Sequence, residues 1–265
     1  MQLKKSAQTA LKLLQVFLVI SAAIVLITRQ DHNAHDYSIG AHAWVTNAAE
    51  YRALAHQAFN AARTQVDTAL STTTSPLPPA IICDVDFTLL SNNSYEAFLI
   101  TNQQTYPYKW RRWVNSCLGT ALPGANEFIE YVHKKNIAIF YVTSRDITLK
   151  GATTKNLRKV GFPVKNNHVL CRTKKQTKVD HRRTIDQNYN VLAILGDQLR
   201  DFDHRFINKD QAILYQEIEQ QKHKFGKRFI VFPNPIYGSW LHILTGNKRL
   251  PKIKELELLR KTLQS

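Results

Sequence analysis

Two aspartates separated by one residue, Asp84 and Asp86, follow an apolar run at residues 80–83 that is typical of a buried strand. Alternate side chains of an extended chain point to the same side, so both carboxyls can address one site. Carboxylates this close repel each other and raise the pKa of at least one of them, unless a cation lies between them. The pair therefore indicates a metal site or an acid/base pair. Taken alone, the pair is better explained as a strand followed by an acidic turn.

Polar side chains also follow two other apolar runs. Thr143 comes directly after residues 137–142, and Asp197 comes after residues 191–195, with Asp201 four residues further on. In an open parallel sheet, functional groups gather outside the carboxyl ends of the strands. We therefore expect these side chains to meet the Asp84 pair at one edge of a sheet.

The elements that would position these groups alternate between strands and helices. Strands are predicted at residues 81–83, 137–142, 169–170, 191–195 and 229–232, with helical patterns between them. This order predicts an α/β fold with a Rossmann-like, mainly parallel sheet and helices on both faces. A helical pattern also covers residues 43–70, and a basic amphipathic helix is predicted at residues 248–264. We expect that last helix to pack on the domain, with a membrane-surface role as the less favoured interpretation.

Composition limits the classes of function. The 265 residues suit one large α/β domain, or a domain with a modest cap. The net charge of +16 attracts anions such as phosphorylated small molecules, nucleic acid or anionic lipid. No zinc-finger spacing or aromatic RNA-binding motif is present, so no specific nucleic-acid partner is expected. The three cysteines are far apart in the sequence and do not indicate a disulfide framework.

The first thirty residues carry the features of a targeting signal. Lys4 and Lys5 precede an apolar stretch at residues 13–27, which suits a signal peptide or a short N-terminal membrane anchor over residues 1–30. We expect export, with the catalytic domain periplasmic or anchored to the membrane outside the cytoplasm. Residues 31–43 are polar and are predicted to be a spacer before a domain at residues 44–265.

The order of the motifs resembles the haloacid dehalogenase superfamily of phosphatases. That pattern is a strand with DxDxT, a strand ending in Thr or Ser, a lysine, and GDxxxD. The corresponding residues here are Asp84-Val85-Asp86-Phe87-Thr88, Thr143, a lysine near position 175, and Gly196-Asp197-Gln198-Leu199-Arg200-Asp201. Segments at 49–54, 123–125, 140–143 and 232–240 resemble, within that superfamily, the class C acid phosphatases, a bacterial surface and periplasmic 5′-nucleotidase family. The resemblance covers residues 44–240. It implies the haloacid dehalogenase fold with a small, mostly helical cap, which we assign to about 44–78, 90–122 and the C-terminal region.

The resemblance implies roles for the carboxylates. Asp84 would attack phosphorus and form an aspartyl phosphate. Asp86 would protonate the leaving oxygen and then activate water. Mg²⁺ would lie between Asp84, the main-chain carbonyl of Asp86, and Asp197. Asp201 would orient the motif lysine or a metal-bound water.

The phosphoryl oxygens would be held by Thr143 and the motif lysine. Lys175 is our assignment for that lysine, and Lys174 is the alternative. The family usually has an acidic residue at Phe87, a departure for which the sequence offers no explanation.

The organic part of the substrate would meet a second set of residues. Trp110 and Tyr237 resemble positions that stack a nucleobase. Packing of the cap against the core is an equal alternative for Tyr237 and the slightly favoured one for Trp110 or its neighbour Trp113. Arg145 would meet phosphate or ribose, or pair with an acidic side chain. Ser144 is also placed at the substrate, where the family usually has Asn.

These features predict an exported, Mg²⁺-dependent acid phosphatase that acts on phosphomonoesters, with nucleoside 5′-monophosphates favoured. The alternatives are a phosphatase for other phosphomonoesters and a degenerate surface module that binds haem or a nucleotide. No cysteine precedes Cys83, so a lipid anchor is not expected. The sequence leaves the oligomeric state open, a homodimer included.

Overall fold

The computed structural model describes residue 15 and residues 36–207, 210–246, 248 and 250–263. Its centre is a five-stranded parallel sheet with the order β5-β4-β1-β6-β7. The strands are β1 (Pro79–Cys83), β4 (Ala138–Asp146), β5 (Val169–Arg172), β6 (Asn190–Gly196) and β7 (Phe229–Val231). The predicted α/β class and all five predicted strands are confirmed.

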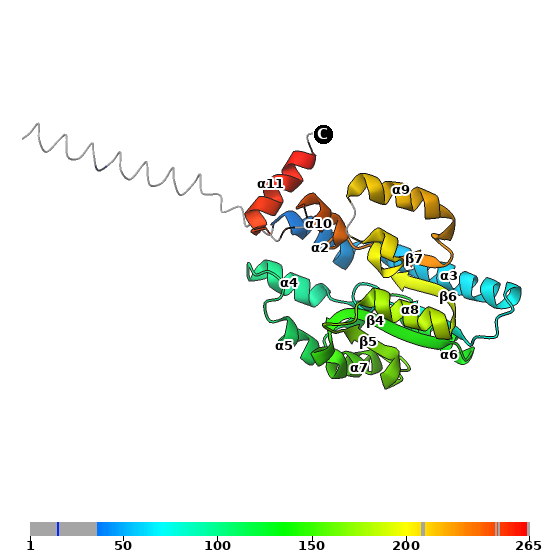
Figure 1. Ribbon diagram of the computed structural model, residues 1–265. Coiled ribbons are helices and arrows are strands. Elements are labelled where there is room, and N and C mark those ends of the chain that lie inside the picture. The colour runs from blue at the N-terminus through cyan, green and yellow to red at the C-terminus, as the bar shows by residue number, and fades with distance from the viewer. Residues whose placement is uncertain (1–14, 16–35, 208–209, 247, 249, 264–265) are drawn as a thin grey trace, which may run out of the picture.

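Helices cover both faces of this sheet (Figure 1). The side chains of β1 alternate, so that Ile81 and Cys83 join one core while Ala80 and Ile82 join the other. The first core is covered by α3 (Ala49–Thr72), α6 (Ala125–Lys134) and α7 (Lys150–Lys159). The second is covered by α8 (Lys178–Asn188) and α9 (Gln211–Gln221), together with two short 3-10 helices at Leu199–Asp201 and His204–Phe206.

Helix α3 corrects one part of the predicted domain organisation. Residues 44–78 were expected to contribute to the cap, but the buried side of α3 packs directly on the sheet. Four of its seven buried residues before position 70 are alanines, and these small side chains allow the helix to approach the strands closely. The long predicted helix is also broken at Ala48, which separates α3 from α2 (Ile39–Asn47).

The cap is made chiefly by the segment that follows β1. It comprises the two-stranded pair β2 (Leu90–Ser91) and β3 (Thr120–Ala121), with α4 (Asn93–Thr101) and α5 (Trp110–Asn115) between them. Its small core contains Tyr95, Leu99 and Trp113. Trp110 packs partly against this core, with its ring stacked on Trp113 at a centroid distance of 5.4 Å.

The two ends of the described chain lie together beside the cap (Figure 1). A 3-10 helix at Asp36–Ser38 leads into α2, and α10 (Ser239–Leu244) and α11 (Lys252–Thr262) end the chain. The predicted spacer over residues 31–43 is therefore helical from position 36 onward. The predicted C-terminal helix is confirmed as α11, with Leu256 buried.

The predicted signal or anchor over residues 1–30 lies outside the described part of the chain, apart from residue 15. Among the helices that are described, none combines the length and hydropathy needed to cross a membrane. The remaining short 3-10 helices are Ile147–Leu149, Asn166–His168 and Lys222–Lys224.

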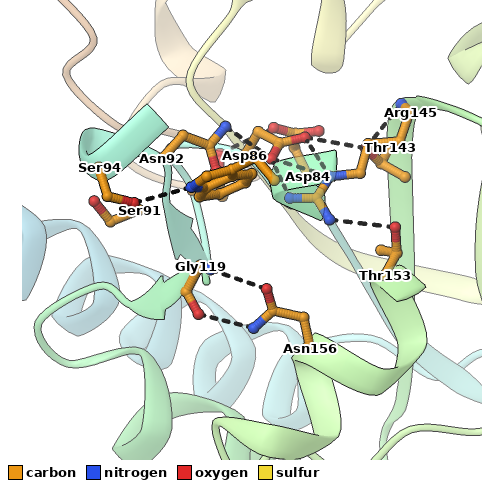
Figure 2. A network of polar contacts seen from close by, with 12 residues as sticks. Asp84, Asp86, Ser91, Asn92, Ser94, Gly119, Thr143, Arg145, Thr153 and Asn156 are labelled. Atoms are coloured by element: carbon orange, nitrogen blue, oxygen red, sulfur yellow. Dashed lines mark hydrogen bonds and ion pairs between the residues drawn. The ribbon is translucent and has the colours of Figure 1, made fainter. Parts of the chain in front are cut away.

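A buried amide joins α7 to the cap. The side chain of Asn156 accepts a hydrogen bond from the Gly119 N–H at 3.0 Å and donates one to the Gly119 carbonyl at 2.8 Å (Figure 2). Asn156→Ala would leave both backbone groups buried without a partner, which costs about 3 kcal/mol of unfolding free energy. Urea denaturation should show this loss, whereas Asn188→Ala, at an exposed helix end, should change stability by less than about 1 kcal/mol. Equal effects of the two variants would contradict this role for Asn156.

Candidate active site

Asp84 lies at the carboxyl end of β1, the middle strand of the sheet. Its N–H donates to the Leu195 carbonyl at 2.9 Å, which continues the β1–β6 ladder by one residue and holds the backbone in place. Its side chain is 5 % exposed and pairs with Lys178. Burial raises the pKa of the Asp84 carboxyl; Lys178 opposes this shift, and the carboxylates of Asp201 and Asp197 reinforce it.

The lysine of the site is Lys178, and this corrects the assignment of Lys175. The Lys178 ammonium contacts Asp84 Oδ1 and lies 2.8 Å from Asp201 Oδ1. Burial alone would lower the pKa of Lys178, but Asp201 and Asp84 raise it above its ordinary value, so the side chain carries a full charge. Lys174 and Lys175 are exposed in the loop that precedes α8.

A helix cap explains why position 178 is the one that reaches the site. The Thr177 N–H donates to Asp180 Oδ2 at 2.8 Å, in a capping box that starts α8. Lys178 is thus the first residue of the helix, next to the strand ends. The Thr-x-x-Asp pattern was the sequence signal for this lysine; in a segment with three lysines, proximity to the expected position was a weaker guide.

Asp86 has its own cationic partner. Arg145 Nη2 lies 2.7 Å from Asp86 Oδ1, and Arg145 Nε contacts both carboxylate oxygens at 3.1–3.2 Å. Asn92 donates to Asp86 Oδ1 at 2.9 Å, and the Thr143 hydroxyl lies 3.4 Å from Oδ2. Burial would raise the pKa of Asp86, but Arg145 and Asn92 outweigh it, so the net shift is downward. Figure 2 shows the Asp86 carboxylate between Asn92 and Arg145.

Arg145 thus forms an ion pair with an acidic side chain, which is one of the roles considered for it. It is 3 % exposed, and its Nη1 also lies 3.2 Å from the Thr153 hydroxyl. The Trp110 ring covers its guanidinium at 5.4 Å from the ring centroid. Ser144, the preceding residue, is exposed and lines the pocket, whereas Thr143 is fully buried.

The third carboxylate of the site, Asp197, follows β6. Its Oδ2 accepts hydrogen bonds from Asn234 at 2.7 Å and from Gln198 at 2.8 Å. Burial, reinforced by Asp201, raises the pKa of Asp197 to about 6 despite these bonds. Gly196 allows Asp201 to fold back onto the strand end, because a Cβ at that glycine would lie 2.6 Å from the Asp201 Cβ.

Oxygen atoms of Asp84, Asp197 and Asp201 lie within 4.8 Å of one another. Together with Asp86 they place four carboxylates beside two cationic side chains, so the cluster carries an excess of negative charge. An all-oxygen donor set suits a hard divalent cation. The Asp86 carboxylate is held by Arg145 and lies outside this cluster of three.

These groups open into a cavity of about 610 Å³ between the sheet edge, the cap and the C-terminal helices. Trp110 and Tyr237 both line it, whereas Trp113 belongs to the cap core. The walls also contain residues that the sequence did not single out. These are Tyr37, Asn92, Glu96, Arg172, Gln198, Arg200, Lys252 and Glu255.

Phe87 has a structural role beside the site. It is fully buried, adopts a left-handed backbone conformation with φ 56°, and packs edge-on against Tyr237 at a centroid distance of 5.3 Å. Val45, Tyr51 and Ile236 are the other buried members of this small core. The residue that departs from the family pattern thus holds the Tyr237 loop and the N-terminal helices against the strand end.

Comparison with known proteins assigns the family. The model of HAD superfamily, subfamily IIIB (acid phosphatase), matches residues 8–240. The chain belongs to this acid phosphatase family. It is also similar to two solved structures of the class C acid phosphatase from Bacillus anthracis, one of them a crystal structure with tungstate bound, at 32% identity and a TM-score of 0.84. Each covers 88% of this chain and 99% of its own.

Family membership makes this chain a phosphatase and confirms the predicted resemblance. Phosphatases of the superfamily generally use a divalent metal, and the three clustered carboxylates provide a place for one. Asp84, Asp86, Thr143, Asp197 and Asp201 come together as the sequence predicted.

Replacing Lys178 should separate its role from that of its neighbours. Lys178→Met removes the charge that offsets Asp84, so kcat should fall by at least about a hundredfold. Lys175→Met, a matched loss of one exposed positive charge, should keep nearly full activity. Circular dichroism and urea denaturation would establish that both variants fold. Activity lost in Lys175→Met and kept in Lys178→Met would contradict the assignment.

Proposed function

We propose that this acid phosphatase is an exported, Mg²⁺-dependent enzyme that hydrolyses phosphomonoesters, with nucleoside 5′-monophosphates as the favoured class. The observation that carries the proposal is the buried contact of the Lys178 ammonium with Asp84 and Asp201 at the mouth of a substrate-sized cavity. This contact brings together a carboxylate that can act as a nucleophile, a fixed positive charge, and a cluster of carboxylate oxygens that can bind a metal ion.

Asp84 is proposed as the nucleophile. Its carboxylate would attack phosphorus, the bond from phosphorus to the ester oxygen would break, and an aspartyl phosphate would form. Lys178 would balance the charge that moves onto the phosphoryl oxygens. Mg²⁺, when bound by Asp84, Asp197 and the Asp86 main chain, supplies the positive charge that offsets the four carboxylates. The hard oxygen donors of these groups favour Mg²⁺.

Asp86 is proposed to carry the proton. Because Arg145 lowers the pKa of Asp86, its resting form is the carboxylate, which suits the second half of the reaction, when water loses a proton. In the first half, a monoanionic phosphomonoester would bring the proton itself, and Asp86 would pass it to the leaving oxygen. Phosphate monoesters hold that proton up to a pH of about 6, so this route predicts activity in acid.

Two further observations support a phosphomonoester substrate. The first concerns its phosphate, and the second concerns an aromatic or nucleoside group. Tungstate, bound in one of the similar structures, is a tetrahedral oxyanion of the same shape as phosphate. Trp110 and Tyr237 line the cavity and offer stacking surfaces. A binding module without activity is less favoured, because the charged residues of the site are all present and paired. Lys178 contacts Asp84 and Asp201, and Arg145 contacts Asp86. A phosphatase for other phosphomonoesters stays the alternative.

Export and assembly are proposals that rest on the sequence. Lys4, Lys5 and the apolar stretch at residues 13–27 support export, and mass spectrometry of the mature N-terminus distinguishes a cleaved signal from a retained anchor. A homodimer is proposed only as one of the assemblies that size-exclusion chromatography with light scattering would resolve.

The direct test of the function is p-nitrophenyl phosphate hydrolysis at pH 5–7. We expect turnover with Mg²⁺, loss of turnover in EDTA, and recovery when Mg²⁺ is restored. Asp84→Asn should lower kcat by more than about a thousandfold, because removal of a nucleophile leaves little of the reaction. Its far-ultraviolet circular dichroism should match that of the wild type. Full activity in EDTA, or in Asp84→Asn, would overturn the mechanism.

A further inference from the structure

The wall of the cavity that faces the sheet edge is built partly by the C-terminal helix. Lys252 and Glu255 of α11 and Leu250 before it line the cavity, beyond residue 240, where the family match ends. Tyr37, from the 3-10 helix that precedes α2, lines the same wall. This part of the site is therefore assembled from both ends of the described chain.

Three of these side chains form a closed hydrogen-bonded group, which we call the terminal triad: Tyr37, Lys252 and Glu255. The Tyr37 hydroxyl donates to Glu255 Oε2 at 2.7 Å and accepts from Lys252 Nζ at 2.6 Å, while Lys252 Nζ lies 2.7 Å from Glu255 Oε2. Glu255 is only 13% exposed in its side chain, and Lys252 is 24% exposed. These contacts fix the position of α11 against the cavity.

The hydrogen-bonding groups that remain free on this wall are mainly acceptors. Both hydrogen bonds to Glu255 fall on Oε2, which leaves Oε1 able to accept. Two of the three Lys252 donors and the single Tyr37 donor are already used within the triad. Glu96 of α4, which also lines the cavity, adds a second carboxyl to this wall.

Charge at this wall points the same way. Lys252 pairs with Glu255, so these two charges balance, and Lys252 also acts electrostatically on Glu96. Burial raises the pKa of Glu96 to about 7, with Lys252 opposing and Asp86 adding to the shift. Such a wall favours a neutral group that brings O–H or N–H donors over a second phosphate.

We propose that the terminal triad and Glu96 form a specificity-determining subsite for the organic part of the substrate, and that this part carries hydroxyl or amino donors. The proposal rests on the proposed phosphatase function. The phosphoryl group binds at Asp84 and Lys178, and the donor-bearing group extends toward α11. A sugar or nucleoside monophosphate has this chemistry, whereas p-nitrophenyl phosphate lacks such donors.

The test compares adenosine 5′-monophosphate with p-nitrophenyl phosphate, both with Mg²⁺, in Glu255→Gln and Lys252→Met. For the nucleotide we expect KM to rise about tenfold in Glu255→Gln, the loss of one hydrogen bond to a charged group, with kcat changed little. Lys252→Met removes a partner that holds Glu255 in place, so it should raise KM in the same direction. For p-nitrophenyl phosphate, kcat and KM should stay within about twofold of the wild type.

The same helix offers matched controls on its exposed side. Lys254 and Glu257 form an exposed ion pair at 2.8 Å, so Lys254→Met and Glu257→Gln make the same charge changes away from the cavity. Both controls should leave the two substrates unaffected. Equal losses for both substrates in the triad variants would mean a structural role and would overturn the proposal, as would unchanged KM for the nucleotide. Wild-type protein inactive toward both substrates would overturn the phosphatase function instead.

Discussion

Four aspartates are buried or half-buried at one edge of the sheet, and the site depends on how their charge is balanced. The fold separates the two carboxylates of the Asp84 pair by giving each its own cation. Lys178 lies between Asp84 and Asp201, and Arg145 forms an ion pair with Asp86. An unpaired buried carboxylate would take up a proton and stop being a nucleophile. The remaining excess of negative charge leaves a place for a divalent ion.

Each cation is delivered by a local structural device. The capping box at Thr177 makes Lys178 the first residue of α8, and the last residues of β4 carry Arg145 to the same edge. Gly196 leaves room for Asp201, and the Phe87 cluster holds the loop that bears Tyr237. The two halves of the DxD motif acquire opposite pKa shifts: burial outweighs Lys178 and raises the pKa of Asp84, whereas Arg145 and Asn92 outweigh burial and lower the pKa of Asp86.

Much of this arrangement was predictable from the sequence, because its signals are local. Apolar runs that end in acid located β1 and β6, and the parallel order placed Asp84 and Asp197 at one edge. Lys178 was missed because three lysines lie within five residues, and only the helix cap decides which one faces inward. The terminal triad was out of reach for a different reason. Tyr37 and Glu255 are 218 residues apart, and neither lies in a recognisable motif.

The most direct test of this account is to trap the phosphoryl group during turnover. Acid quenching of a single turnover with ³²P-labelled substrate, followed by peptide mass spectrometry, would locate any covalent phosphate. The account predicts transient label on Asp84 in the wild-type enzyme and none in Asp84→Asn. Label on another residue, or product that accumulates with no covalent label at any time, would contradict it.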